Sequence, residues 1–577
     1  MKSFSQNRRR HFPETVCLVL WLLLLACSGC GDGGAPVRGS VSPASVEPWN
    51  EEPVVRTVPG QVMGFEDRAD TWVWKAIPYA RPPTGPLRWK APRDPVPWEE
   101  IRRRTNFSEP CPQYLALGDS ILGNEDCLYL NVWRPRSAER KLPVYFWIHG
   151  GGNSIGSAVV GEDYNGANLA SLSGVVVVTV NYRLGPLGWF THPAIRSGAA
   201  GDARDASGNY GTLDLIKALE WVRDNIEAFG GDPGNVTITG ESAGAANVLT
   251  LLISPPAEGL FHRALAQSGG ARSNPLAAGD AASRTVILTR LLKDGIAANP
   301  GEAEAILDAM SLAEVEAYLR SQRPRELLKC YQPNFGGMIS FPYNFEDGTV
   351  IPAGGFKVLE TGAYPGKVPV ILGTNKEEKK LFIFADSAFT GRDDLYQVVA
   401  SYASDVWKAT GVDQVARKLR SHPDQPGVYA YQFLWGAYRE TGGSVIPDPW
   451  GFKLGCCHTL EIPFFFGNDT INVLMQLLVF SEENRAGREA LSRAMMAYMA
   501  AFARTGDPNG ARARLPAWLP WSNDPGAPRC IQFDVGEDQE PLLRMSAEEF
   551  TEEGVKARMA AEVPEPLYSE AVAHLGW

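Results

Sequence analysis

The chain has 577 residues, of which 44% are hydrophobic, so it can bury a large core in one big domain or in two to four smaller ones. Its formal net charge is −11 and it lacks a basic patch, which argues against nucleic-acid binding. No unit of roughly 20 to 50 residues repeats along the sequence, which argues against a solenoid or a propeller.

The first 26 residues form a targeting segment. Arginines 8 to 10 precede the apolar run VCLVLWLLLLA at 16–26, which is too short to span a bilayer and therefore predicts a secretory signal peptide. The run ends in LLACSGCGDGG, which resembles a bacterial lipobox, with Leu24 and Ala26 placed as that motif requires before Cys27. We therefore predict a lipid anchor on Cys27 in a bacterial envelope protein. Cys30 is the second candidate for the lipid anchor, but it fits the motif less well. If the segment is instead a plain signal peptide without lipid attachment, the protein would be secreted or periplasmic.

A flexible tether is predicted to follow the signal. Residues 27–52 are rich in glycine, proline and serine and have no apolar periodicity, so the folded domain is expected at 53–577. Cysteine and histidine spacings indicate no zinc site there, since the Cys27–Cys30 pair falls inside the targeting region. We predict neither a metal nor a cofactor.

Strands alternate with helical patterns through the rest of the chain. The run at 174–183, GVVVVTVNYR, is typical of a strand buried on both faces, and 211–230 has apolar residues at helical spacing. This alternation predicts an α/β fold with a mostly parallel sheet, whose sites lie beyond the carboxyl ends of its strands. The further predicted strands are 142–150, 235–239, 264–269, 368–375 and 428–435.

Two serines lie in G-x-S-x-G patterns, and their contexts differ. Ser242, in GESAG, follows a predicted strand and precedes a predicted helix, as a nucleophile on a sharp strand-to-helix turn requires. Ser154, in GNSIG, has no strand directly before it, so we interpret it as a loop residue. The loop HGGGN at 149–153 can supply backbone N–H donors to an oxyanion, and the amide of Ala243 is the expected further donor.

A serine nucleophile needs a base, and the base needs an acid to orient it. In this fold the order along the chain is serine, acid, histidine. Three histidines precede Ser242, and His262 follows it too closely. His422 lies in a predicted turn and His574 in the terminal tail, so His458 remains as the candidate base. The acid is expected after the strand at 368–375, where spacing alone does not choose between Glu377 and Glu378.

Several longer motifs resemble the type-B carboxylesterase/cholinesterase family. They include EDCLYLNVW at 125–133, NYRLGPLGW at 181–189, the stretch 208–248 and CHTLEIPFFFG at 457–467, together with AIPYARPPTGPLRW at 76–89 and ARTGDPNG at 503–510. The resemblance spans nearly the whole mature chain. It implies a single α/β-hydrolase domain with a large central, mostly parallel sheet flanked by helices.

The resemblance also implies roles for single residues. It makes Ser242 the nucleophile and His458 the base, and it aligns Glu378 with the family's orienting acid, although Lys379 replaces the glycine that usually follows. The oxyanion donors correspond to the amides of three residues, Gly151, Gly152 and Ala243. Glu241 matches a buried acidic position of the family.

A disulfide and an ion pair are implied in the same way. Cys111 and Cys127 match the family's first disulfide, and Arg88 and Glu125 match a structural ion pair. The loop at 112–126 lacks the tryptophan with which cholinesterases receive the choline cation, so we expect poor selectivity for choline esters.

We therefore predict a serine hydrolase that cleaves small-molecule carboxylic esters through a Ser-His-Glu triad and an acyl-enzyme intermediate. Activity should fade near pH 6, where an ordinary imidazole takes up a proton. Alternatives are a lipase or thioesterase with the same triad, or a binding module without catalysis. Membrane contact is expected only through the N-terminal anchor.

Overall fold

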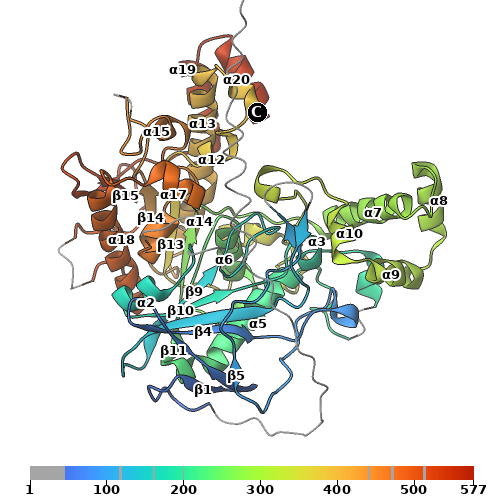
Figure 1. Cartoon of the computed structure of the whole chain (residues 1–577). Coiled ribbons are helices and arrows are strands. Elements are labelled where there is room, and N and C mark those ends of the chain that lie inside the picture. The colour runs from blue at the N-terminus through green and yellow to red at the C-terminus, as the bar shows by residue number, and fades with distance from the viewer. Residues whose placement is uncertain are drawn as a thin grey trace, which may run out of the picture.

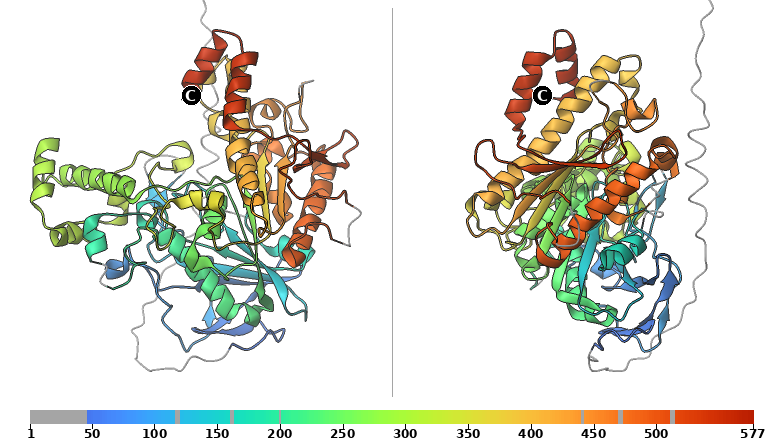
Figure 2. Two further views of the ribbon diagram at one scale, coloured as in Figure 1. Left: turned by 180° about the vertical axis from the view of Figure 1, so that it is seen from behind. Right: turned by 90° about the vertical axis from the view of Figure 1, so that its left-hand side faces the viewer.

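A single large sheet organises the protein. The computed structural model describes residues 46–577 except 116–119, 160–162, 199–200, 440–441, 469–472 and 511–514, so the predicted signal peptide, Cys27 and Cys30 lie outside the described residues. The sheet has 11 strands, and helices cover both of its faces (Figures 1 and 2). The predicted α/β fold with flanking helices is confirmed.

The central strands of this sheet run parallel. The strand order is β16-β15-β14-β13-β12-β11-β9-β10-β8-β4-β3, and neighbours are parallel from β15 through β10 and antiparallel beyond them. The bounds are β3 (Phe65–Asp67), β4 (Thr71–Pro78), β8 (Tyr129–Pro135), β9 (Leu142–Ile148), β10 (Val176–Val180), β11 (Gly231–Glu241), β12 (Arg263–Gln267), β13 (Val370–Asn375), β14 (Val428–Phe433), β15 (Cys530–Val535) and β16 (Pro541–Ser546). All six predicted strands are present, with ends that differ by a few residues.

Two apolar cores lie on opposite faces of the sheet, and β9 shows why. Phe146 and Ile148 face one core, and Tyr145 and Trp147 face the other, because successive side chains of a strand point to opposite faces. The helices α5 (Tyr210–Asn225) and α6 (Ala243–Ile253) contribute to the first core, and α2 (Ala167–Ser173) and α18 (Arg485–Thr505) to the second. Burial on both faces explains the nearly continuous apolar sequence of β9 and β10.

Further helices extend from this layered body. A lobe built from α7 (Leu276–Lys293), α8 (Pro300–Ala309), α9 (Leu312–Ser321) and α10 (Pro324–Leu328) projects to the right in Figure 1. At the top of the same view, α13 (Asp393–Lys408) packs with the C-terminal helices α19 (Glu552–Glu562) and α20 (Leu567–Leu575) around a small third core. No helix among the described residues is long and apolar enough to cross a membrane.

The packed structure begins earlier in the chain than the predicted domain boundary at residue 53. Trp49, inside the stretch predicted to be a tether, is 1% exposed and packs edge-on against Trp74, so the packed structure includes it.

A disulfide joins Cys111 and Cys127, which are 16 residues apart. Such a short closed loop stabilises the fold mainly by restricting the unfolded chain. The four cysteines that are free in the described part are Cys330, Cys456, Cys457 and Cys530.

Candidate active site

Ser242 stands on a sharp turn between β11 and α6. Its backbone has φ 58° and ψ −122°, a conformation that L-residues rarely adopt, and its N–H donates to the carbonyl of Gln267 at 2.8 Å. The flanking glycines are required, because a Cβ on Gly240 or Gly244 would come within 2.6 Å or 2.0 Å of the carbonyl oxygen of Ile148. A strained serine backbone between two small residues is the geometry that holds a serine hydroxyl above a sheet.

The glycine-rich loop after β9 lies against this serine. A Cβ on Gly150 would be 3.1 Å from the Cβ of Ser242, and both Gly151 (φ 101°) and Gly152 (φ 61°) have left-handed backbones. Within the described chain, the amides of Gly151, Gly152 and Ala243 donate no hydrogen bond. One of these unpaired donors follows Ser242 in the turn, and the other two lie in the loop that contacts Ser242 at Gly150. Stabilisation of an oxyanion requires such donors.

Glu378 and His458 form a buried pair. The Nδ1 of His458 is 2.6 Å from the Oε2 of Glu378, and the two residues are 2% and 0% exposed. The other carboxylate oxygen, Oε1, accepts hydrogen bonds of 2.7 Å from Thr374 Oγ1 and from the amide of Asn375. Burial by itself raises the pKa of Glu378, but the charge of His458, the hydrogen bond with His458 and that from the amide of Asn375 lower it more, so this carboxyl is ionised.

The neighbouring Glu377 has a different environment. It forms an ion pair of 2.6 Å with Lys380, and both side chains are buried. Its Oε2 also accepts hydrogen bonds from the amides of Cys456, at 3.1 Å, and Tyr438, at 3.2 Å. Geometry thus distinguishes the two glutamates that sequence spacing left open: Glu378 contacts the histidine, and Glu377 joins a buried ion pair.

The second imidazole nitrogen faces the residue next to the nucleophile. Nε2 of His458 lies 3.1 Å from Oε1 of Glu241, which precedes Ser242 in the chain. Among the described residues neither nitrogen of His458 is hydrogen-bonded to Ser242, and Nε2 has no hydrogen-bond partner. Hydrogen bonds between catalytic groups are often long in a free enzyme and tighten only when substrate binds.

A third buried acid, Glu461, completes this cluster, and the sequence reasoning missed it. Its Oε2 accepts a 2.6 Å hydrogen bond from Asn375 Nδ2, and its Oε1 accepts one of 3.4 Å from the hydroxyl of Ser268. Its position three residues after His458, within CHTLE, was the available signal. Burial, and then the charge of Glu378, raises the pKa of Glu461 to about 7.

The surrounding acids control the protonation of His458. Burial by itself lowers the pKa of this imidazole, but the carboxylates of Glu241, Glu378 and Glu461 raise it, to about 9. Burial also raises the pKa of Glu241 well above its ordinary value. The cluster therefore keeps a proton on the histidine at a higher pH than an isolated imidazole would.

Aromatic rings enclose the histidine, and no sequence motif pointed to them. The ring centroids of Trp407 and Phe382 lie 4.9 Å and 5.2 Å from that of His458, and Phe335, which is 40% exposed, lies 5.5 Å from Phe382. These rings exclude water on the imidazole side of the candidate site and strengthen its electrostatic interactions.

Comparisons with known proteins identify relatives of this chain. The model of the carboxylesterase family matches residues 51–393 and 387–540. The chain is 32% identical over 489 residues to the para-nitrobenzyl esterase of Bacillus subtilis (strain 168), covering 81% of this chain and 92% of that one. It is also 32% identical over 549 residues to the medium-chain fatty acyl-CoA hydrolase precursor of Anas platyrhynchos, covering 87% and 92%.

Solved structures show the same similarity. Carboxylesterase EST55 of Geobacillus stearothermophilus superposes with a TM-score of 0.64 at 30% sequence identity, over 86% of this chain and 98% of that one. A structure of a PNB esterase gives a TM-score of 0.63 at 29% identity, with the same two coverages.

Proposed function

This chain belongs to the carboxylesterase family and is a carboxylic ester hydrolase, and we propose that Ser242, His458 and Glu378 are its catalytic triad. The observation that carries the proposal is the 2.6 Å contact between His458 Nδ1 and the buried Glu378. Glu378 follows β13 and the strained Ser242 follows β11, so both lie at the carboxyl ends of the parallel strands. A carboxylate in this position fixes the tautomer and orientation of the imidazole and stabilises its protonated form.

The proposed reaction has two stages. The hydroxyl of Ser242 attacks the ester carbonyl while Nε2 of His458 takes its proton, and the oxyanion is bound by the amides of Gly151, Gly152 and Ala243. His458 then protonates the leaving alcohol, which leaves an acyl group on Ser242. Water, deprotonated by His458, attacks this acyl-enzyme and releases the acid. Each oxyanion donor contributes about 3–4 kcal/mol to the stability of the transition state.

A fluorophosphonate probe tests the proposal. Such a probe phosphonylates an activated serine, so the purified enzyme should be labelled at Ser242, and prior incubation with an ester substrate should slow the labelling. A binding module without catalysis, the alternative of a different class, would take up no label. Mass spectrometry of the tryptic peptide identifies the modified residue, and a label on any other serine would contradict the proposal.

The acid limb of the pH profile is expected to lie above pH 6.5. The base must be unprotonated to accept the serine proton, and the pKa of His458 is raised to about 9, so kcat/KM should rise with pH through this raised value. This expected limb lies at higher pH than the fall near pH 6 that an ordinary imidazole predicts. The measurement is kcat/KM for p-nitrophenyl acetate against pH, corrected for spontaneous hydrolysis.

The variant Glu241→Gln tests the cause of this shift. Removal of the carboxylate 3.1 Å from Nε2 should lower the pKa of His458 and move the acid limb to lower pH by about one unit. Glu220→Gln is the control, because Glu220 lies on α5 and pairs with Lys217 instead. An unchanged limb in Glu241→Gln would show that Glu241 does not charge the imidazole.

The substrate class is proposed to be small-molecule carboxylic esters, with thioesters as the second candidate. Similarity to the para-nitrobenzyl esterase favours the first, and similarity to the fatty acyl-CoA hydrolase precursor favours the second. The rates for p-nitrophenyl esters of increasing acyl length, compared with the matching thioesters, distinguish an esterase from a lipase or a thioesterase.

We also propose export and lipid attachment at Cys27, on the lipobox-like LLAC of the sequence. Globomycin blocks the peptidase that processes lipoproteins, so it should cause the uncleaved precursor to accumulate. Cys27→Ser should abolish incorporation of labelled palmitate, whereas Cys30→Ser should leave it unchanged. Labelling lost only in Cys30→Ser would move the anchor to the second cysteine.

A further inference from the structure

A cavity of about 560 Å³ is separate from the candidate active site, because its lining contains none of the residues Ser242, Glu378 and His458. Three segments line it: residues 271–274, which follow β12, residues between 341 and 360, and the helix α14 (Gln414–Arg420). Pockets for small organic ligands have volumes of roughly 300 to 1,000 Å³, so the space is large enough for one.

The apolar part of the lining suits an organic body. The rings of Phe341, Tyr343 and Phe356 face the cavity together with Leu359 and Val415. Phe356 and Leu359 belong to the main core, so that their positions are set by packing.

The charged part of the lining favours an anion. Arg272 and Lys357 form no ion pair with any described residue, whereas Lys418, the third basic side chain, pairs with Glu360 at 2.9 Å. The remaining acid, Glu346, accepts a 2.8 Å hydrogen bond from Ser273. Three basic and two acidic side chains leave one net positive charge at this cavity, on a chain whose formal net charge is −11.

We propose that this cavity binds an amphipathic organic monocarboxylate, with its carboxylate at Arg272 and Lys357 and its apolar body against Phe341, Tyr343 and Phe356. A monoanion neutralises the single excess positive charge. A phosphate dianion would add negative charge beside Glu346 and Glu360, which disfavours it. Arginine presents several N–H donors to a carboxylate in a fixed planar geometry, which suits it to this role.

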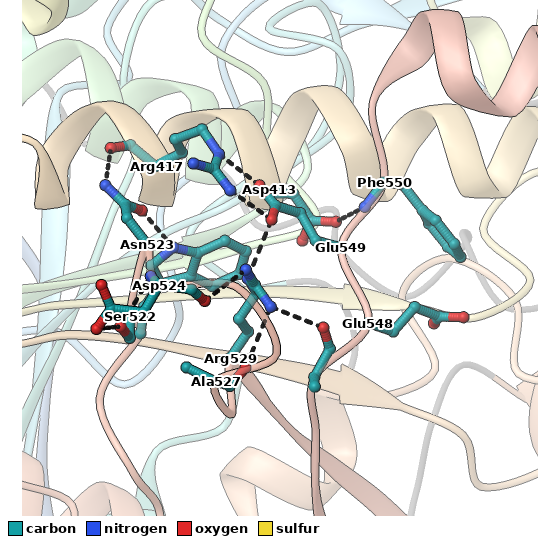
Figure 3. Close-up of polar contacts among 12 residues, drawn as sticks. Asp413, Arg417, Ser522, Asn523, Asp524, Ala527, Arg529, Glu548, Glu549 and Phe550 are labelled. Carbon is teal, nitrogen blue, oxygen red and sulfur yellow. Dashed lines mark hydrogen bonds and ion pairs between the residues drawn. The ribbon is translucent and has the colours of Figure 1, made fainter.

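Residues that do not line the cavity hold its helical wall in place, and Figure 3 shows their polar contacts. Arg417 of α14 makes two hydrogen bonds to the carboxylate of Glu549, which also pairs with Arg529 at 3.0 Å. Just before α14, Asp413 accepts hydrogen bonds from the amide of Phe550, at 2.7 Å, and from Lys408, at 2.6 Å. A wall fixed in this way needs little ordering when a ligand binds, which favours affinity.

Isothermal titration calorimetry with sodium 4-phenylbutyrate tests the proposal. The intact enzyme should bind this carboxylate at one site, and the double variant R272M/K357M should bind it at least tenfold more weakly. The neutral 4-phenylbutyramide should bind the intact enzyme more weakly than the acid does. Arg140→Met is the matched control, since Arg140 is an exposed arginine outside the cavity, and it should bind the acid as the intact enzyme does.

A second variant blocks the space without altering charge. Ala271→Trp should fill the cavity and remove binding of acid and amide alike, while hydrolysis of p-nitrophenyl acetate stays unchanged. The variant Ser242→Ala separates this site from catalysis. Its affinity for 4-phenylbutyrate should equal that of the intact enzyme, whether or not Ser242 proves to be the nucleophile. The proposal is overturned if the acid does not bind the intact enzyme, or if it binds R272M/K357M or Ala271→Trp as tightly as it binds the intact enzyme.

Discussion

Replacement of Ser242 by alanine is expected to lower kcat for p-nitrophenyl acetate by about 10⁵- to 10⁶-fold, the loss typical of a serine hydrolase without its nucleophile. The fold should persist, because the side chain of Ser242 makes no hydrogen bond to a described residue and alanine is smaller. Its unusual backbone, φ 58° and ψ −122°, is imposed by the turn between β11 and α6. The measurement is kcat of the purified variant, with the melting temperature as a test of folding.

The sequence itself contains the matched control for this experiment. Ser154 lies in the other G-x-S-x-G pattern, but its hydroxyl donates to the carbonyl of Gly151 at 3.3 Å and accepts from the amide of Ile339 at 3.2 Å. Ser154→Ala should therefore loosen the glycine-rich loop and lower kcat by about tenfold or less. Equal losses in the two variants, or more than 1% residual activity in Ser242→Ala, would exclude Ser242 as the nucleophile.

Substitution of Glu378 by glutamine is expected to lower kcat by about 10⁴-fold, the loss seen when the acid of a serine-protease triad becomes an amide. Thr374 and the amide of Asn375 can still donate to the glutamine oxygen, so the side chain keeps its position. Its NH₂ group then faces Nδ1 of His458 and favours the tautomer that places the proton on Nε2. That tautomer cannot accept the proton of Ser242.

Substitution of the neighbouring Glu377 by glutamine is expected to lower the stability of the fold much more than it lowers kcat. Glu377→Gln leaves Lys380 without its partner in a site where that lysine is 1% exposed, which is expected to cost about 3–5 kcal/mol of unfolding free energy. Its kcat should change far less than that of Glu378→Gln. The two variants are compared by kcat and by urea unfolding, and a 10⁴-fold loss of kcat in Glu377→Gln at full stability would reverse the assignment.

Much of the fold was predictable from local patterns. The strands β9 to β14 could be recognised because burial on both faces demands apolar, β-branched runs, and the strand–turn–helix around Ser242 needs glycines two places to either side. Both signals lie within a few neighbouring residues. The choice between Glu377 and Glu378 was different, because adjacent residues in a turn after β13 have the same spacing to every motif. The family resemblance pointed to Glu378, and in the structure the partners of the two residues, His458 and Lys380, distinguish them.

The sequence by itself determined the family, the order of the strands along the chain and the candidate nucleophile, since these depend on residue types at short separations. It also indicated the candidate base, by chain order and elimination of the other histidines. Tertiary structure decided what surrounds His458. It placed Glu241 and Glu461 beside His458, enclosed the imidazole between Trp407 and Phe382, and formed a separate cavity at Arg272 and Lys357. Apart from Glu461, which lies three residues after His458, these features bring together residues far apart in the chain. The pKa shifts depend on burial and distance, which no linear pattern contains.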